Sequence, residues 1–127
     1  MRKHVGGLVG YGSVTSAENI INTGDITAGS ATAGIMGYNG TTSTLTNVKN
    51  EGKVTTVGSQ VAGLIGQQQG NVIINGSYNK ANITGSSYLG GLVGYNVSYT
   101  TTVNNSYSDG NITGNGSYIG GVIGYGN

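Results

Sequence analysis

The chain repeats one seven-residue pattern of apolar and small positions five times. Each copy places two adjacent apolar residues between glycines and ends in Tyr or Gln. The copies are VGGLVGY at 5–11, TAGIMGY at 32–38, VAGLIGQ at 61–67, LGGLVGY at 89–95 and IGGVIGY at 119–125. Their third residues lie 27, 29, 28 and 30 positions apart. So regular a period indicates a structural repeat.

Two further patterns recur between these Gly-rich segments. One reads G-x-[IV]-T, with Ala in place of Gly in one copy, and its apolar members lie 28, 29 and 29 positions apart. We expect these members to form a ladder of core side chains: Ile26, Val54, Ile83 and Ile112. A looser pattern precedes it, in which Ala17, Leu45, Ile74 and Val103 share one phase.

Each period therefore holds three short apolar–polar stretches separated by Gly, Asn and Ser, which is typical of strands joined by turns. We predict an all-β fold, a right-handed parallel β-solenoid that forms a single domain over residues 1–127. It should have about 28–29 residues per coil, three short strands per coil, and four coils plus a fifth strand on the first side. An antiparallel sandwich is the alternative, but it would not require the same side chain at the same phase of every period.

Composition supports a repeat over disorder. The chain has 26 Gly and only 7% charged residues, yet it is rich in the β-branched residues that disordered segments lack. The formal net charge is +1; Lys49, Lys53 and Lys80 are scattered, and the short basic start at Arg2, Lys3 and His4 is too small for a phosphate-binding surface, which disfavours nucleic-acid binding. Without Cys there is no disulfide framework. No apolar run is long enough to span a membrane, and no signal peptide is visible, so an exported chain would be a mature form or a part of a larger protein.

The adjacent apolar residues of each Gly-rich segment leave two interpretations open. Neighbours in a strand point to opposite faces, so one set would fill the core and the other would form an exposed interface stripe. Alternatively, a bulge turns both sets inward. The residues concerned are Leu8, Val9, Ile35, Met36, Leu64, Ile65, Leu92, Val93, Val122 and Ile123.

Aromatic and hydroxyl side chains recur at constant phase as well. The first tyrosine ladder comprises Tyr11, Tyr38, Tyr95 and Tyr125 and is broken by Gln67; Tyr78 with Tyr107, and Tyr88 with Tyr118, form two more. We expect these rings to stabilise stacked coils, and a sugar- or partner-binding strip is the functional alternative. A Thr ladder of Thr27, Thr55, Thr84 and Thr113 suggests ice binding, but the charges of Asp25 and Lys53 interrupt its surroundings.

The tetrads at the centre of the Gly-rich segments resemble the GLUG repeat, whose name describes Gly-Leu-hydrophobic-Gly. They read GLVG at 7–10, GIMG at 34–37, GLIG at 63–66, GLVG at 91–94 and GVIG at 121–124, and NSYSDGNITG at 105–114 is similar to the family's linking sequence. The resemblance covers nearly the whole chain. It implies a β-solenoid from a secreted or surface protein of bacteria, such as an adhesin, and no catalytic motif. Gln67 and Ala81 depart from the pattern.

No residues suggest chemistry. His4 is the only histidine, and neither a catalytic triad nor an acidic metal-binding loop can be assembled. We therefore expect no enzyme activity, no catalytic residues, no cofactor and no metal. The leading hypothesis is a structural, self-associating unit of an extracellular fibre or a bacterial surface adhesin. Its partners would be further copies, end to end or side by side, adjacent repeats of a longer chain, or a surface glycan or host partner. The alternatives are a carbohydrate- or ice-binding module and a noncatalytic region of a surface enzyme.

Overall fold

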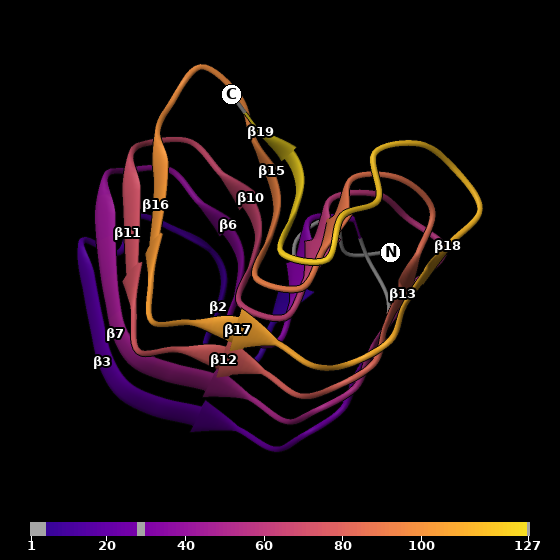
Figure 1. Cartoon of the computed structure of the whole chain (residues 1–127), viewed down its shortest axis with the longest axis horizontal. Coiled ribbons are helices and arrows are strands. Elements are labelled where there is room, and N and C mark those ends of the chain that lie inside the picture. The colour runs from indigo at the N-terminus through magenta and orange to yellow at the C-terminus, as the bar shows by residue number, and fades with distance from the viewer. Residues whose placement is uncertain (1–4, 28–29, 127) are drawn as a thin grey trace.

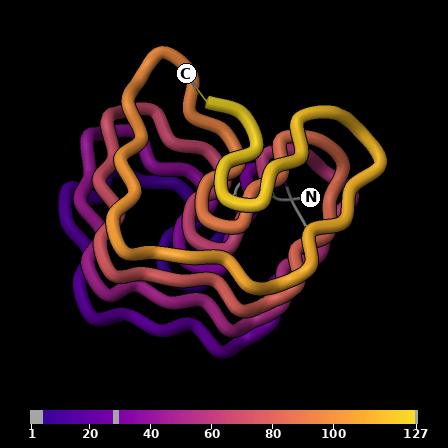
Figure 2. Tube along the Cα trace, viewed as in Figure 1, coloured from indigo at the N-terminus to yellow at the C-terminus, as the bar shows by residue number. Residues whose placement is uncertain are grey.

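The chain winds into a stack of coils in which every strand pairing is parallel. The computed structural model describes residues 5–27 and 30–126, so Arg2, Lys3 and His4 lie outside the described residues. No helix occurs in these ranges. The path runs anticlockwise as it comes toward the viewer (Figures 1 and 2), which makes the solenoid right-handed, the usual hand of parallel crossovers. The predicted parallel β-solenoid is thus confirmed.

Within the described residues, the strands form four sheets that run along the stack. Each Gly-rich segment contributes to two of them, which we call the leading and trailing sheets. The leading sheet contains β1 (Val5–Gly6), β5 (Thr32–Ala33), β9 (Val61–Ala62) and β14 (Leu89–Gly90). The trailing sheet contains β2 (Val9–Gly12), β6 (Met36–Asn39), β10 (Ile65–Gln68), β15 (Val93–Asn96) and β19 (Ile123–Gly126).

The connecting sequence forms the other two sheets, named here the outer and distal sheets. The outer sheet contains β3 (Ser16–Asn22), β7 (Ser43–Asn50), β11 (Val72–Asn75), β12 (Tyr78–Asn79), β16 (Thr101–Asn104) and β17 (Tyr107–Ser108). The distal sheet contains β4 (Ile26–Thr27), β8 (Val54–Thr55), β13 (Ile83–Gly85) and β18 (Ile112–Gly114).

The register of the pairings follows the sequence period. Ile65 of the trailing sheet pairs with Met36 on one side and with Val93 on the other. In the distal sheet, Ile83 pairs with Val54 and Ile112. Equivalent residues of successive coils therefore lie above one another, as in-register stacking requires.

The structure differs from the expected three-sided coil because each Gly-rich segment bends back on itself. Its two arms are the leading and trailing strands, and the bend lies inside the coil, so the cross-section has two lobes (Figure 1). Glycine permits this bend. A Cβ at Gly63 would overlap the side chain of buried Asn79 and lie 2.5 Å from the carbonyl oxygen of Gly91, and one at Gly66 would lie 2.6 Å from the carbonyl oxygen of Gln60.

Two separate hydrophobic cores lie on either side of this inward fold. The first residue of the Gly-rich segment, such as Val61, packs with Val54, Ile83 and Leu89 in the distal lobe. The larger core fills the other lobe. It consists of Ala17, Ile35, Met36, Leu45, Val48, Leu64, Ile65, Val72, Ile74, Leu92 and Val93. The Gly-rich segments thus act as a partition that supplies apolar side chains to both cores.

A column of left-handed residues marks the corner of the outer sheet. Asn19, Asn47 and Asn105 have φ angles between 50° and 56°, and Gly76 in the remaining coil has φ 55°. Asn and Gly are the residues that adopt this conformation most readily. These residues follow the looser sequence pattern by two positions in every coil, so the chain turns this corner directly after Ala17, Leu45, Ile74 and Val103.

Candidate functional site

The structure places both apolar positions of the Gly-rich segments inside the molecule. In the middle coils, the pairs Ile35 and Met36, Leu64 and Ile65, and Leu92 and Val93 are fully buried in the larger core. The bend accounts for this, because residues on either side of it point into the same lobe. An exposed stripe along the whole solenoid is therefore absent from the described coils. Exposure returns only at the end coils, where Leu8 is 53% and Val122 38% exposed.

The core ladder expected from the second pattern lies in the distal lobe. Val54 and Ile83 are fully buried, and Ile26 and Ile112 of the end coils pack against them while remaining partly exposed. The difference follows from position in the stack, since an end coil has a neighbour on one side only.

The first tyrosine ladder stacks as two pairs separated by Gln67. The rings of Tyr11 and Tyr38 lie 4.5 Å apart at 5°, and those of Tyr95 and Tyr125 lie 5.6 Å apart at 13°. Gln67 pairs with both Tyr38 and Tyr95 in the backbone register, so it occupies the position of a missing ring.

The Tyr88–Tyr118 ladder joins the first ladder instead of standing alone. The two rings stack on each other at 5.1 Å, and Tyr88 meets Tyr95 edge-on at 5.2 Å while Tyr118 meets Tyr125 edge-on at 4.6 Å. We call these four residues the tyrosine cluster. Stacked and edge-on pairs stabilise one another beyond simple burial, so the cluster ties the last two coils together.

The geometry of the cluster limits what it can bind. Sugars bind aromatic residues through the faces of the rings, and here stacking covers the faces between adjacent coils. The cluster presents to solvent the edges of its rings and the outward side of Tyr118, which is 51% exposed. This arrangement serves coil-to-coil contact better than a long sugar-binding strip.

The tyrosine cluster also contains unusual backbone. Tyr88 and Tyr118 have φ angles of 56° and 63°, and Ala31 and Gln60 have φ 47° and 64°. These four residues directly precede the leading strands β14, β5 and β9 and the bridge residue Ile119. Left-handed conformation is unfavourable for bulky side chains, so packing around the segment entrance holds these residues in place.

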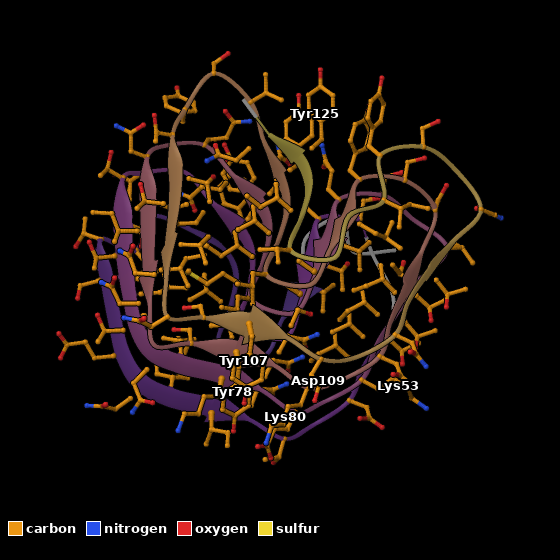
Figure 3. All side chains as sticks on the ribbon, in the orientation of Figure 1. Lys53, Tyr78, Lys80, Tyr107, Asp109 and Tyr125 are labelled. Atoms are coloured by element: carbon orange, nitrogen blue, oxygen red, sulfur yellow. The ribbon has the colours of Figure 1, made fainter. Side chains whose placement is uncertain are left out.

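A second group of side chains forms what we call the charged tyrosine face on the outside of the coils. It contains Lys49, Glu51, Tyr78, Lys80, Tyr107 and Asp109; Figure 3 shows Tyr78, Lys80 and Tyr107 close together with Asp109 beside them, and Lys53 lies further along the coil. Tyr78 and Tyr107 pair in register and their rings stack at 5.3 Å. The ammonium groups of Lys49 and Lys80 lie 5.4 and 5.0 Å from the centre of the Tyr78 ring, within cation–π range.

Tyr78 is further fixed by its hydroxyl group. This group donates a hydrogen bond of 2.6 Å to Oε2 of Glu51 in the preceding coil. The hydrogen bond favours the protonated phenol, and together with partial burial and the negative charge of Glu51 it raises the pKa of Tyr78 to about 12. The phenol therefore stays neutral and remains a donor over the physiological pH range.

Sequence reasoning missed a column of buried amides beneath the Gly-rich bends. Nδ2 of Asn22 donates to Oδ1 of Asn50, Nδ2 of Asn50 donates to Oδ1 of Asn79, and Nδ2 of Asn79 donates to the hydroxyl of Ser108. Each Asn also bonds the backbone carbonyl two residues further on. The signal was present, because these asparagines recur at 28 and 29 residues. It was not distinguishable from the general abundance of Asn.

The described part of the chain shows no group of three or more His, Asp, Glu or Cys close enough to hold a metal ion. Nor does that part contain a helix long and apolar enough to cross a membrane. A hollow of about 340 Å³ opens beside the last coil and is lined by Thr101, Ile123, Gly124 and Gly126. This lining offers no ionisable side chain for chemistry.

Residues 85–113 match the sequence family described as the GLUG motif. The match spans the end of β13, the Gly-rich segment at 89–95, and the outer and distal strands that follow, which is about one coil. Comparisons with curated proteins and with solved structures gave no significant match. The other coils repeat the matched coil in their register, and the chain is therefore a repeat protein that carries the GLUG motif and folds as a β-solenoid.

Proposed function

We propose that this repeat unit is a structural, noncatalytic element that associates with further coils through its end faces, within an extracellular fibre or a bacterial surface adhesin. The observation that carries the proposal is the contrast between end and middle coils. Leu8 is 53% exposed, whereas Leu64 and Leu92 at the same phase are fully buried. This apolar position of the Gly-rich segments is fully covered in coils that have a neighbour on each side and is exposed at the end of the stack.

The described end strands of the Gly-rich segments carry none of the devices that block strand addition. Natural sheets protect their edges with Pro, Lys or inward charges. The strands β1, β2 and β19 read VG, VGYG and IGYG. The buried amide column likewise stops at the Ser108 hydroxyl in the last coil, and another coil would continue it. A further coil, from the same polypeptide or from a second copy, would find complementary groups at either end.

The number of strands constrains how two copies meet. The trailing sheet has five strands, whereas the distal sheet has four. If the distal sheets of two copies stack directly, two Gly-rich segments compete for one level of the trailing sheet. Association therefore requires either a staggered junction or displacement of one end segment.

Sedimentation velocity and electron microscopy at micromolar concentrations test the proposal. The wild-type chain should form oligomers or filaments, because assembly buries the exposed apolar positions of the end coils. A Leu8→Lys/Val122→Lys variant should remain monomeric, because the charge opposes burial. Val57→Lys is the matched control, since Val57 is 89% exposed on the side of the stack, and it should assemble normally. A wild-type chain that stays monomeric throughout contradicts self-association.

Glycan binding is a second candidate, and the tyrosine cluster is the observation that favours it. The exposed side of Tyr118 and the ring edges of Tyr88, Tyr95 and Tyr125 lie together at one place on the surface. A glycan array with the wild type and with Tyr118→Ala separates the two functions. Binding that disappears in a folded Tyr118→Ala protein supports a sugar site, and the absence of any bound glycan contradicts it.

A further inference from the structure

The charged tyrosine face holds two phenols in a geometry suited to coupling. Tyr78 and Tyr107 occupy equivalent positions in adjacent coils, and their rings stack with centres 5.3 Å apart and planes at 21°. Tyr107 is 46% exposed, so a reagent in solution can reach it. Their backbones are joined by parallel strand pairing between β12 and β17, which keeps the rings together.

Glu51 adds a chemical feature to this pair. One-electron oxidation of a phenol is easiest when its proton leaves at the same time, and a hydrogen-bonded base can accept that proton. The Oε2 atom of Glu51 accepts the hydrogen bond from the Tyr78 hydroxyl at 2.6 Å. The ammonium groups of Lys49 and Lys80 lie close to the Tyr78 ring. They disfavour the radical cation that would form if the phenol lost an electron and kept its proton, so oxidation of Tyr78 depends on transfer of the proton to Glu51.

We propose that Tyr78 and Tyr107 form an oxidative cross-linking site, at which a one-electron oxidant of the haem peroxidase and hydrogen peroxide class generates a dityrosine bond between adjacent coils, with Glu51 as proton acceptor. The site lies on the side of the stack, and the proposal does not depend on association through the end faces. Its product would be a covalent bond between the third and fourth coils.

The reaction balances without a further reagent. Each phenol loses one electron to the oxidant and its hydroxyl proton, which passes to Glu51 from Tyr78 and to water from Tyr107. The two phenoxyl radicals form a carbon–carbon bond between the ring carbons next to the hydroxyl-bearing carbons. The hydrogens on those carbons then move to the phenolic oxygens and restore aromaticity. Two electrons and two protons leave in total, and one hydrogen peroxide accepts them to give two water molecules.

The Tyr11–Tyr38 pair is an internal reference. Its rings are closer, at 4.5 Å and 5°, and burial together with the Tyr11 phenol raises the pKa of Tyr38, whereas the Tyr78 hydroxyl donates to the Glu51 carboxylate. If proximity alone decided the yield, this pair would cross-link at least as well. If the carboxylate matters, Tyr78 and Tyr107 should give the greater yield.

The sequence allows a direct readout. Trypsin cleaves after Lys and Arg, and the peptide of residues 54–80 contains Tyr78 as its only tyrosine, whereas Tyr11 and Tyr38 share the peptide of residues 4–49. The folded chain is treated with a haem peroxidase and hydrogen peroxide at a concentration at which sedimentation shows a monomer. Dityrosine fluorescence and mass spectrometry of the tryptic peptides follow. We expect a product that joins peptide 54–80 to peptide 81–127, with fragmentation placing the bond at Tyr107.

Two variants test the assigned roles. Tyr107→Phe keeps the stacked ring but cannot form a phenoxyl radical, so the product should be lost. Glu51→Gln keeps an oxygen acceptor but no base, so the yield of this product should fall several-fold while the Tyr11–Tyr38 product is unchanged. Circular dichroism of each variant verifies folding. A product between 54–80 and 81–127 that forms equally well in the Glu51→Gln variant overturns the role of the carboxylate, and cross-links found only between molecules overturn the site.

Discussion

At the bends of the middle Gly-rich segments, a buried asparagine occupies the space that a side chain on the glycine would need. The third glycines stack along the molecule through hydrogen bonds such as Gly63 N–H to the Gly91 carbonyl. Asn50 and Asn79 lie against them and are fully buried. The glycine and the asparagine therefore depend on each other. Their sequence positions recur with the same period because the contact is repeated at Gly7, Gly34 and Gly63, whereas Ser108 takes the place of the asparagine at Gly91.

Gly63→Ala should destabilise the protein markedly, because the new methyl group would overlap Asn79 and the Gly91 carbonyl. Overpacking of this kind costs about 1–3 kcal/mol or more. Gly121→Ala is a matched control at the same phase, since a Cβ there meets nothing within 4 Å. Thermal unfolding by circular dichroism measures both variants. Equal melting temperatures for the two would contradict the account of the bend.

Tyr78 predicts a specific response to alkaline pH. Its pKa is raised to about 12 by the hydrogen bond to Glu51, whereas an unfolded tyrosine titrates near 10. Because the folded pKa is the higher one, the hydrogen bond stabilises the fold fully below about pH 10. That contribution is lost as pH rises through about 12. Absorbance near 295 nm should show a late-titrating phenol in the wild type that titrates earlier in Glu51→Gln, whereas the raised pKa of Tyr38, which is caused by burial and by Tyr11, should be unchanged. An unchanged titration in that variant would exclude Glu51 as the cause.

The strands are short elements that hold their shape through the stack. Those of the leading sheet are two residues long, as Val61–Ala62 illustrates, and the longest strand, Ser43–Asn50, has eight. None is long enough to be stable alone. Ladders of like side chains between coils supply the missing stabilisation: aromatic stacks outside, amides beneath the bends and aliphatic side chains within the two cores. Gln67 is the interruption in the longest aromatic ladder.

Gln67→Tyr should raise the melting temperature. Gln67 pairs in register with Tyr38 and Tyr95, so a ring at this position can stack on both. Aromatic pairs contribute about 0.5–1.5 kcal/mol each beyond burial. Gln67→Leu is the control, because it adds apolar surface without an aromatic face and should give a smaller gain. A Tyr variant no more stable than the Leu variant would argue against stacking as the source of ladder stability.

The whole molecule is divided by its Gly-rich partition into two lobes with separate cores. The same segments line both, since Val61 packs in the distal lobe and Leu64 in the larger one. If the packing in either core is lost, the Gly-rich segments lose the apolar contacts on one of their two sides. The two lobes should therefore unfold together, although no apolar cluster bridges them among the described residues.

Ile83→Ala tests this coupling from the distal lobe. Ile83 is fully buried there, and truncation of such a side chain costs about 2–5 kcal/mol. Amide hydrogen exchange should show lower protection in the distal strand β13 and also at Val72 and Ile74 in the larger core. Protection lost only around β13 would show that the lobes open independently.

The period of the sequence was enough to predict most of the architecture. The equivalent spacing of the Gly-rich segments and of Ile26, Val54, Ile83 and Ile112 predicted a parallel solenoid, and the observed registers agree. Stacking between tyrosines of adjacent coils followed from the same logic. Contacts between side chains at non-equivalent positions of the repeat did not follow from it. The meeting of Tyr88 with Tyr95 and the hydrogen bond from Tyr78 to Glu51 depend on how the chain turns between equivalent positions.

What the sequence by itself determined is therefore the relation between coils, because translation by one period brings identical residues together whatever the shape of the coil. Tertiary structure alone decided that shape. Whether adjacent apolar residues such as Leu64 and Ile65 point to opposite faces or to one core depends on a bend, and the bend exists because Gly63 can lie against buried Asn79. That contact joins residues from different sides of the coil, and no periodicity along the chain encodes it.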